Sequence, residues 1–341
     1  MQYDLLDRAG YLLLRHWPTA AAAAVGYLVA LLTGLSAWTL VLVCAVAGFL
    51  YEAYRARRAP AHGGAQGAGV YSLPCGADFY PRRPPDPAAF DRVIGLGRAK
   101  QAIVDALETA FRSDLQKIYN LRPAKGILLY GPPGTGKTSF ARAAADRFGC
   151  SFYVVNASSL AASLVGQTEA NIRYLFAHAR QNAPAVIFFD EIDAIGQKRS
   201  GRPINSPSDL AINVLLSELD GFRELEGVVV VAATNRPDTL DEALTRAGRF
   251  DVKIEVGLPG REDREKLFAL YLKGRPCDIG NTDLSLLALE TEGLSPADIR
   301  LVCDQAALAA AKKSRPISVQ DVREAVAEVR QQKTALGSVV W

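Results

Sequence analysis

One short motif limits the possible folds of this chain more than any other feature. The segment GPPGTGKT, residues 131–138, follows an apolar run of strand length at Gly126–Tyr130 and opens a helical pattern that reaches Phe148. It matches the pattern G-x-x-x-x-G-K-[ST] in full. The glycines allow the loop to curl until its amide groups point inward at a phosphate, and the dipole of the following helix favours the same negative charge. The sequence therefore predicts a phosphate-binding α/β unit.

The same loop supplies side chains for a nucleoside triphosphate and its metal ion. We expect Lys137 to reach the β and γ phosphates and the Thr138 hydroxyl to ligate Mg²⁺. Further contacts with the nucleotide are expected from the other residues of the loop and the start of its helix, namely Pro133, Gly134, Thr135, Gly136 and Ser139.

The order of the remaining elements predicts the fold class. Further apolar runs of strand length alternate with helical patterns, at Phe152–Asn156, Ala185–Asp190, Val228–Thr234 and Val252–Val256. Such alternation is typical of a parallel sheet with crossover helices on its faces. Only helical patterns follow, at Glu262–Lys273, Asp283–Glu292, Ser295–Lys313 and Ser318–Val329. We therefore expect an α/β domain followed by a small α-helical one.

Acidic residues end the third of these expected strands, AVIFFDEID at residues 185–193. Ligands of open α/β sheets bind at the carboxyl ends of the strands, where Asp190 and Glu191 would lie. Asp190 is expected to hold Mg²⁺, and Glu191 to polarise the attacking water as a general base. Asp193 fits a helix cap or loop charge as well as it fits a catalytic role.

Three polar residues downstream complete the candidate catalytic set. Asn235 follows the fourth strand and is a candidate for orienting the attacking water, although Asn-Arg-Pro also fits a turn. Arg246 and Arg249 are candidates for an arginine finger, which stabilises charge on the transferred phosphoryl group in cis or in trans. Surface arginines at the end of a helix are the alternative.

An uncharged run from Trp17 to Tyr51 is the second strong feature. As one straight helix it would be about 52 Å long, whereas the hydrocarbon core of a bilayer is roughly 30 Å thick. Turn-compatible residues interrupt it at 33–36. We therefore expect a membrane anchor over residues 1–58, with transmembrane helices at about 17–33 and 36–52.

Charge predicts how this anchor is oriented. Arg8 and Arg15 precede the apolar run, and further arginines follow it at 55–58. Positive charge on both flanks favours both flanks in the cytoplasm, which requires an even number of crossings. The expected location is the inner (cytoplasmic) membrane, as a multi-pass protein with residues 90 onward in the cytoplasm. A single tilted span at about 26–50 and a buried soluble hairpin are the alternatives.

Composition predicts the character of the segment between the expected anchor and the α/β domain, and it bears on whether the protein binds nucleic acid. Residues 59–89 are dominated by Gly, Ala and Pro without a period, as in a flexible linker. The chain has 39 basic and 36 acidic residues, a net charge of +3. This balance gives no case for a nucleic-acid partner.

Taken together, these motifs resemble the AAA ATPases, a family of ring-forming ATP-driven motors, from about Phe90 to Arg330. The resemblance implies a P-loop AAA module with a large α/β subdomain at 90–257, a small α-helical lid at 258–331 and a tail at 332–341. DRVIGLGRAK, residues 91–100, is similar to the entry motif of the family. It implies that Ile94 and Gly95 lie near adenine, while GLSPADIR at 293–300 implies that Ala297 approaches the nucleotide from the lid.

The resemblance also implies cofactors and partners. ATP and Mg²⁺ would be bound, and the chain would form a ring homo-oligomer, in this family usually a hexamer. Asn235 matches the family's sensor 1 residue. Arg246 and Arg249 would act in trans, on the site of the neighbouring subunit.

Within the family, the chain is most similar to the membrane-anchored FtsH-like AAA proteases. It departs from them in having no HExxH, since its histidines are only His16, His62 and His178, so we expect no zinc protease activity. Leu164, Val165 and Gly166 occupy the pore-loop position, where Leu164 replaces an aromatic residue that grips a threaded chain.

These features predict a membrane-anchored ATP hydrolase that remodels, extracts or unfolds proteins, including membrane proteins, at the cytoplasmic face. The alternative is a non-threading assembly or regulatory ATPase that partners a separate, full-length AAA protease. A nucleic-acid motor is a third class, which the balanced charge and the anchor disfavour.

Overall fold

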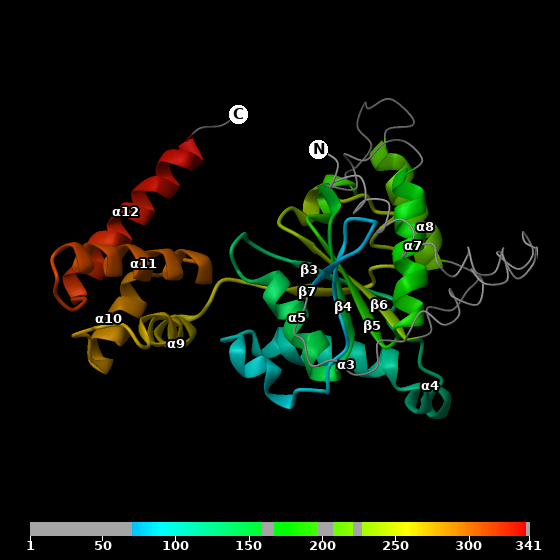
Figure 1. Ribbon diagram of the computed structural model, residues 1–341, viewed down its shortest axis with the longest axis horizontal. Helices are drawn as coiled ribbons and strands as arrows, with labels where there is room; N and C mark the ends of the chain where they lie inside the picture. Colours follow the sequence, from blue (N-terminus) through cyan, green and yellow to red (C-terminus); the bar gives the residue numbers. More distant parts are fainter. Residues whose placement is uncertain (1–69, 159–166, 197–206, 221–226, 339–341) are drawn as a thin grey trace, which may run out of the picture. The chain divides into compact units, whose positions relative to one another are not determined.

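The computed structural model describes residues 70–158, 167–196, 207–220 and 227–338. The chain divides into two compact units, residues 1–68 and Gly69–Trp341, and the described residues belong to the second (Figure 1). The expected transmembrane helices and the expected pore loop Leu164–Gly166 lie outside the described residues. Within the described ranges, no helix combines the length and apolar character needed to cross a bilayer.

A mixed sheet forms the centre of the described unit, in the strand order β1-β2-β4-β5-β6-β3-β7. The pairs β4–β5, β5–β6, β6–β3 and β3–β7 are parallel, which confirms the α/β class with a mostly parallel sheet. The parallel strands are β3 (Gly126–Tyr130), β4 (Ser151–Asn156), β5 (Ala185–Asp190), β6 (Val228–Thr234) and β7 (Val252–Glu255).

Helices cover both faces of this sheet, which explains why the inner strands β3, β5 and β6 are apolar along nearly their whole length rather than alternating. Along β5, Ile187 and Phe189 belong to one core cluster, whereas Val186 and Phe188 belong to the other. The first cluster lies under α7 (Gln167–Gln181) and α8 (Pro207–Asp220), and the second under α3 (Gly97–Phe111) and α5 (Lys137–Phe148) (Figure 1). A short helix, α4 (Ser113–Tyr119), follows α3.

The structure differs from the predicted flexible linker over the part of 59–89 that it describes. Strands β1 (Tyr71–Ser72) and β2 (Asp78–Tyr80) form an antiparallel hairpin that pairs with the edge of β4. The Phe79 ring stacks on Tyr153 with 4.8 Å between centroids, and buried Ala77 joins the core. A 3-10 helix, η1 (Pro87–Arg92), follows, with Asp86 as its N-cap. The apolar residues among the Gly and Pro are therefore enough to dock this segment on the sheet.

A separate helical core follows the sheet, as the sequence predicts. It is built by α9 (Arg261–Leu272), α10 (Asn281–Glu290), α11 (Pro296–Lys312) and α12 (Val319–Ser338). Its buried residues include Phe268, Val302 and Val322. The start signal of α11 is formed as expected, because the Ser295 hydroxyl accepts from the Asp298 amide and Pro296 occupies the first turn. Helix α12 continues past Val329, where the sequence predicts its end, and reaches Ser338 within the segment 332–341.

Candidate active site

The phosphate loop lies between β3 and α5, and close packing surrounds two of its three glycines. Gly131, Gly134 and Gly136 all have positive φ, at 149°, 76° and 86°. A Cβ on Gly131 would come 2.3 Å from the Val256 carbonyl oxygen, and one on Gly134 would come 2.7 Å from the Ser295 hydroxyl. Only glycine fits these two positions, because β7 and the start of α11 lie against the loop.

Lys137 points into the loop, and no ion pair joins it to a carboxylate among the residues that the structure describes. Its Nζ donates to the carbonyl oxygens of Gly131 and Pro132, at 2.9 Å each. Only 8% of the residue is exposed, and this burial lowers the pKa of Lys137, while the negative charges of Asp190 and Asp193 act in the opposite direction. A buried ammonium group held by two neutral carbonyls fits an anion such as a phosphate. Thr135 is also buried, whereas Pro133, Gly134, Gly136, Thr138 and Ser139 are exposed.

A hydrogen bond joins the loop to the acidic end of β5. The Thr138 hydroxyl donates to Asp190 Oδ2 at 2.9 Å, although the two residues are far apart in the sequence. A hydroxyl and a carboxylate are oxygen ligands of the kind that Mg²⁺ takes, together with phosphate oxygens and water. Among the described residues there is no cluster of three or more His, Cys, Asp or Glu that could hold a metal alone. The pair therefore fits Mg²⁺ that arrives with a nucleotide.

Glu191 has an unusual backbone conformation for a residue with a side chain. Its φ is +52° and its ψ is +48°, and its amide donates to Asp190 Oδ1 at 3.1 Å. Non-glycine residues in this region carry strain, which clusters at functional sites. The residue is exposed just past the strand, and the Ser158 hydroxyl lies 3.5 Å from Glu191 Oε2. The carboxylate is therefore open to solvent at the edge that carries Asp190.

Asn235 lies one residue beyond β6, at the same edge of the sheet. It is exposed, whereas Thr234 before it is 1% exposed. The Thr234 hydroxyl donates to Asp193 Oδ1 at 2.7 Å and accepts from the Arg236 amide at 2.9 Å. Asp193 lies in the 3-10 turn η2 (Ile192–Ala194). The structure therefore gives Asp193, which the sequence left open, a defined partner on the neighbouring strand.

The two candidate arginines lie at the other end of β3 from the phosphate loop. A Cβ on Gly126, the first residue of β3, would lie 2.6 Å from the Arg249 carbonyl oxygen, and the Arg249 amide bonds to the Arg246 carbonyl. The loop begins at Gly131, about 17 Å farther along the strand. This separation exceeds the reach of an arginine side chain, so neither residue can touch the phosphate site of its own chain.

Their side chains have different surroundings. Arg249 donates from Nε and Nη2 to the two oxygens of Asp220, at 2.9 and 2.5 Å, and this pairing lowers the pKa of Asp220. Its Nη1 donates to the Ala243 carbonyl. Arg246 is exposed, and its guanidinium has no hydrogen-bond or ion-pair partner within the described part of the chain. Of these two arginines, Arg246 is the one without a partner among the described residues.

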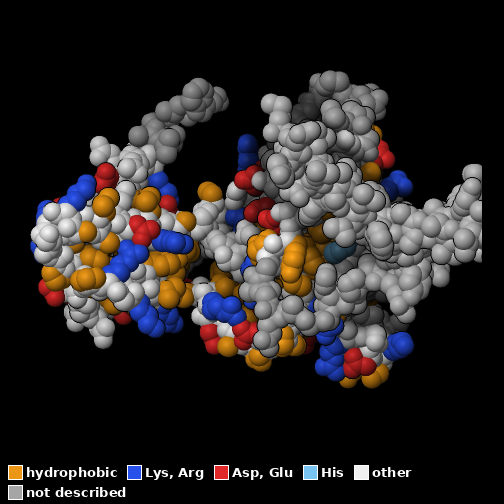
Figure 2. Space-filling view, in the orientation of Figure 1, with side chains coloured by type: hydrophobic (Ala, Val, Ile, Leu, Met, Phe, Trp, Pro, Cys, Tyr) orange, Lys and Arg blue, Asp and Glu red, His pale blue; other side chains and the backbone are white. Residues whose placement is uncertain are grey.

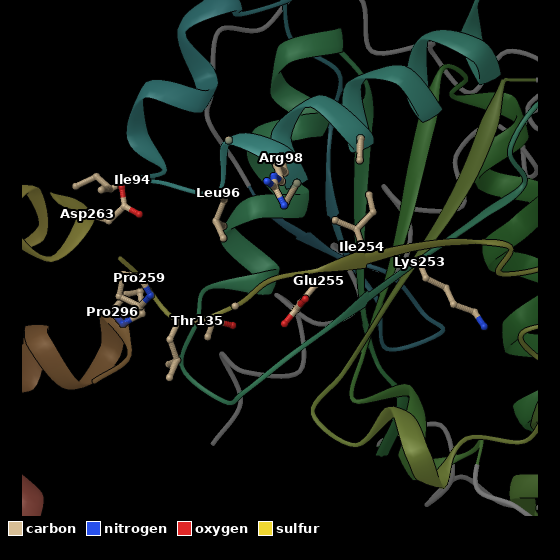
Figure 3. Close-up of a pocket in the computed structure, with 15 residues that line it drawn as sticks. Ile94, Leu96, Arg98, Thr135, Lys253, Ile254, Glu255, Pro259, Asp263 and Pro296 are labelled. Carbon is tan, nitrogen blue, oxygen red and sulfur yellow. The ribbon is translucent and has the colours of Figure 1, made fainter. Parts of the chain in front are cut away.

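A pocket of about 460 Å³ lies beside the loop (Figure 3). Figure 3 shows Ile94 and Asp263 together at one end, and Pro259 and Pro296 near Thr135. The remaining lining combines the apolar residues Leu96, Ala99, Ala102, Ile254 and Leu258 with the charged residues Arg98, Lys253 and Glu255. The apolar part of this lining suits the flat face of a base.

The backbone around Gly95 shapes this pocket. Gly95 and Leu96 both have positive φ, at 74° and 61°. A Cβ on Gly95 would lie 2.6 Å from the Asp263 carboxylate. Ala297 lies beside the loop, because its amide donates to the Gly134 carbonyl at 3.2 Å. The sequence did not indicate Asp263 or Leu96, since their proximity comes only from the folded chain.

Comparisons with known proteins agree with this geometry. Residues 127–258 match the family described as "ATPase family associated with various cellular activities (AAA)", and residues 281–324 match the AAA+ lid domain. The matched ranges contain the phosphate loop, the strand ends and most of the helical core.

Similar proteins include two kinds of ATPase. The "ATP-dependent zinc metalloprotease FtsH 2" of Symbiobacterium thermophilum is 40% identical over 247 residues, which is 71% of this chain and 42% of the relative. "ATP-dependent zinc metalloprotease FtsH" of Caldicellulosiruptor bescii is 42% identical over 246 residues, or 70% and 39% of the two chains. The "Cell division cycle protein 48 homolog" of Archaeoglobus fulgidus is 40% identical over 225 residues, which is 66% of this chain and 31% of the relative.

The chain thus spans less than half the length of these relatives. The AAA family uses ATP with Mg²⁺, in agreement with the donor set at Thr138 and Asp190. The chain therefore contains an AAA ATPase domain at residues 127–258 and an AAA+ lid domain at residues 281–324.

Proposed function

We propose that this protein hydrolyses ATP and uses the energy to remodel other proteins. One observation carries the catalytic part of the proposal. The hydrogen bond between Thr138 and Asp190 brings the phosphate loop and the acidic end of β5 to one edge of the sheet. Mg²⁺ bound there would offset the negative charge of the phosphates.

Each residue at this edge has a role that its surroundings support. Lys137 binds the β and γ phosphates in place of its two carbonyl partners, and Thr138 and Asp190 hold the metal ion. The exposed Glu191 takes a proton from the attacking water, which the Asn235 amide orients. The adenine occupies the pocket beside Ile94 and Gly95, with Ala297 closing the lid side.

The completed site is shared between subunits of a ring. Arg246 is exposed and lies too far from the phosphate loop of its own chain, so we assign it to the site of a neighbouring copy. Exposed leucines on α9, α10 and α11 offer apolar surface for protein contacts, and Figure 2 shows hydrophobic side chains among charged ones on that part of the molecule. They are Leu270, Leu286, Leu289, Leu301 and Leu308. As AAA proteins form hexameric rings, we propose a hexamer.

Changing Gly95 to alanine is expected to weaken ATP binding about tenfold or more. The new Cβ would meet the Asp263 carboxylate, and the positive φ alone costs a residue with a side chain about 1–2 kcal/mol. Isothermal titration with a non-hydrolysable ATP analogue measures the change in Kd. The matched control is Gly257→Ala in the same pocket, where an added Cβ meets only Glu255 at 3.9 Å. Equal affinity of the two variants would contradict this view of the pocket.

We further propose that the protein acts at the cytoplasmic face of a membrane. The uncharged run from Trp17 to Tyr51, with arginines on both flanks, supports an anchor with two crossings. The FtsH relatives are named as proteases, but residues 1–341 contain no HExxH, so we propose that this chain remodels or extracts its substrate without cutting it.

A second candidate is a regulatory ATPase that joins a separate, full-length AAA protease. The observation that favours it is Leu164, an aliphatic residue where a threading ATPase carries an aromatic one. Such a protein would change the activity of its partner and would not itself thread a substrate.

Reconstitution separates the two candidates. The full chain is placed in lipid vesicles with a single-pass membrane protein fused to a fluorescent domain, and fluorescence is followed after ATP addition. Remodelling predicts an ATP-dependent loss of signal with the wild type and none with Glu191→Gln. An unchanged signal, together with an altered rate of substrate cleavage when a full-length AAA protease is added, would favour the regulatory function instead.

A further inference from the structure

Thr234 is a buried polar residue that has no role in the reaction proposed above. It is the last residue of β6, it is 1% exposed, and it pairs in register with Tyr130 of β3. Tyr130 is the residue directly before the phosphate loop. Thr234 therefore connects the strand that carries the loop with Asn235.

Both hydrogen-bonding functions of its hydroxyl are engaged. The hydroxyl donates to Asp193 Oδ1 at 2.7 Å and accepts from the Arg236 amide at 2.9 Å. Asn235 lies between Thr234, which the sheet fixes, and Arg236, whose amide is fixed by this hydroxyl. The backbone on both sides of Asn235 is thus held, and with it the direction in which the amide side chain leaves the sheet edge.

Asp193 fixes the orientation of that hydroxyl from the other side. With Asp193 as acceptor, the hydroxyl proton points at the carboxylate, which leaves an oxygen lone pair for the Arg236 amide. Asp193 lies in η2, two residues after Glu191, and its negative charge also acts on Lys137. The turn that carries the candidate base is therefore tied to the strand end that carries Asn235.

We propose that Asp193 and Thr234 are positioning residues that hold Asn235 at the angle needed to orient the attacking water. The inference rests on the proposed ATP hydrolysis, and it adds a function for two residues to which the proposed reaction assigns none. It predicts that their loss affects the turnover number and not the binding of ATP, because the binding groups lie on the phosphate loop and in the pocket.

The test compares Thr234→Val with Thr234→Ser in the full chain. Valine keeps the shape and removes the hydroxyl, whereas serine keeps the hydroxyl. Misplacing a catalytic group by about 1 Å costs up to about 100-fold in rate, so we expect Thr234→Val to lower kcat about 10- to 100-fold with KM within about twofold. We expect Thr234→Ser to retain most of the wild-type kcat.

The decisive measurement is the effect of Thr234→Val on kcat in a chain that also carries Asn235→Ala. If Thr234 acts through Asn235, then Thr234→Val has no further effect on kcat once the amide is gone. An equal fold-loss in both backgrounds, or no loss in either, would overturn the inference. Should Thr234→Val fail to fold, Asp193→Ala takes its place and is expected to show the same dependence on Asn235. Failure of the proposed function itself is distinct, because the wild type would then show no ATP turnover at all.

Discussion

Replacing Glu191 with glutamine is expected to lower kcat for ATP by about a thousandfold, within the range of about 10²–10⁴ attributed to general bases. The amide has the size of the carboxylate but cannot accept the proton of the attacking water. ATP binding should be retained, because the proposal assigns the phosphate contacts to Lys137 and the metal contacts to Thr138 and Asp190, and none of them to Glu191. Phosphate release measures turnover, and fluorescence of a labelled ATP analogue measures binding.

A matched control tests whether the effect belongs to the site. Glu328 is an exposed glutamate on α12, outside the sheet edge, and Glu328→Gln removes the same charge. It should leave both turnover and binding unchanged. Wild-type turnover of Glu191→Gln would show that another group activates the water, and loss of ATP binding would show that Glu191 contributes to the nucleotide site.

Replacing Arg246 with alanine is expected to lower kcat by about 10³-fold or more, which is the effect of arginine fingers in phosphoryl transfer. The expected loss follows from its position, exposed and at the far end of β3 from its own phosphate loop. ATP binding and stability should change little, because Arg246 has no partner among the described residues of its own chain. Arg249→Ala is expected to have a further effect, because it also breaks the bidentate pair with Asp220 and so removes a contact within the chain.

Mixing subunits distinguishes a finger in trans from one in cis. Arg246→Ala and Glu191→Gln are each expected to be inactive alone. In a mixed ring, an Arg246→Ala subunit keeps its own Glu191 and receives Arg246 from a Glu191→Gln neighbour, so turnover should recover with the mixing ratio. If mixtures remain as inactive as the separate variants, Arg246 does not serve the neighbouring site.

The parts of the fold that sequence could predict are those with local signals. The loop at 131–138 follows its strand directly, and the apolar run of β5 ends at Asp190. The order of the apolar runs and these motifs therefore predicts both the parallel sheet and its ligand-binding edge. Ser295 and Pro296 likewise start α11 where the capping pattern predicts.

The parts that could not be predicted depend on contacts between distant residues. The approach of Asp263 to Gly95, and the bond between Thr234 and Asp193, have no signature in either local segment. The Gly- and Pro-rich composition of its segment gave no indication of the hairpin of β1 and β2. In the structure, β2 pairs with β4, and Phe79 stacks on Tyr153. In each case, a contact between residues distant in the sequence determines a local structure that the local composition does not specify.

The most direct test is phosphate release by the full chain, assembled as rings in lipid vesicles, with ATP in Mg²⁺ buffer and again after chelation by EDTA. Because Thr138 and Asp190 supply the protein's oxygen ligands and Lys137 alone cannot offset the charge of the phosphates, we expect turnover in Mg²⁺ and none after chelation. Turnover that is equal with and without the metal ion, or absent from intact rings in Mg²⁺, would contradict the assignment of this edge of the sheet as an ATP hydrolysis site.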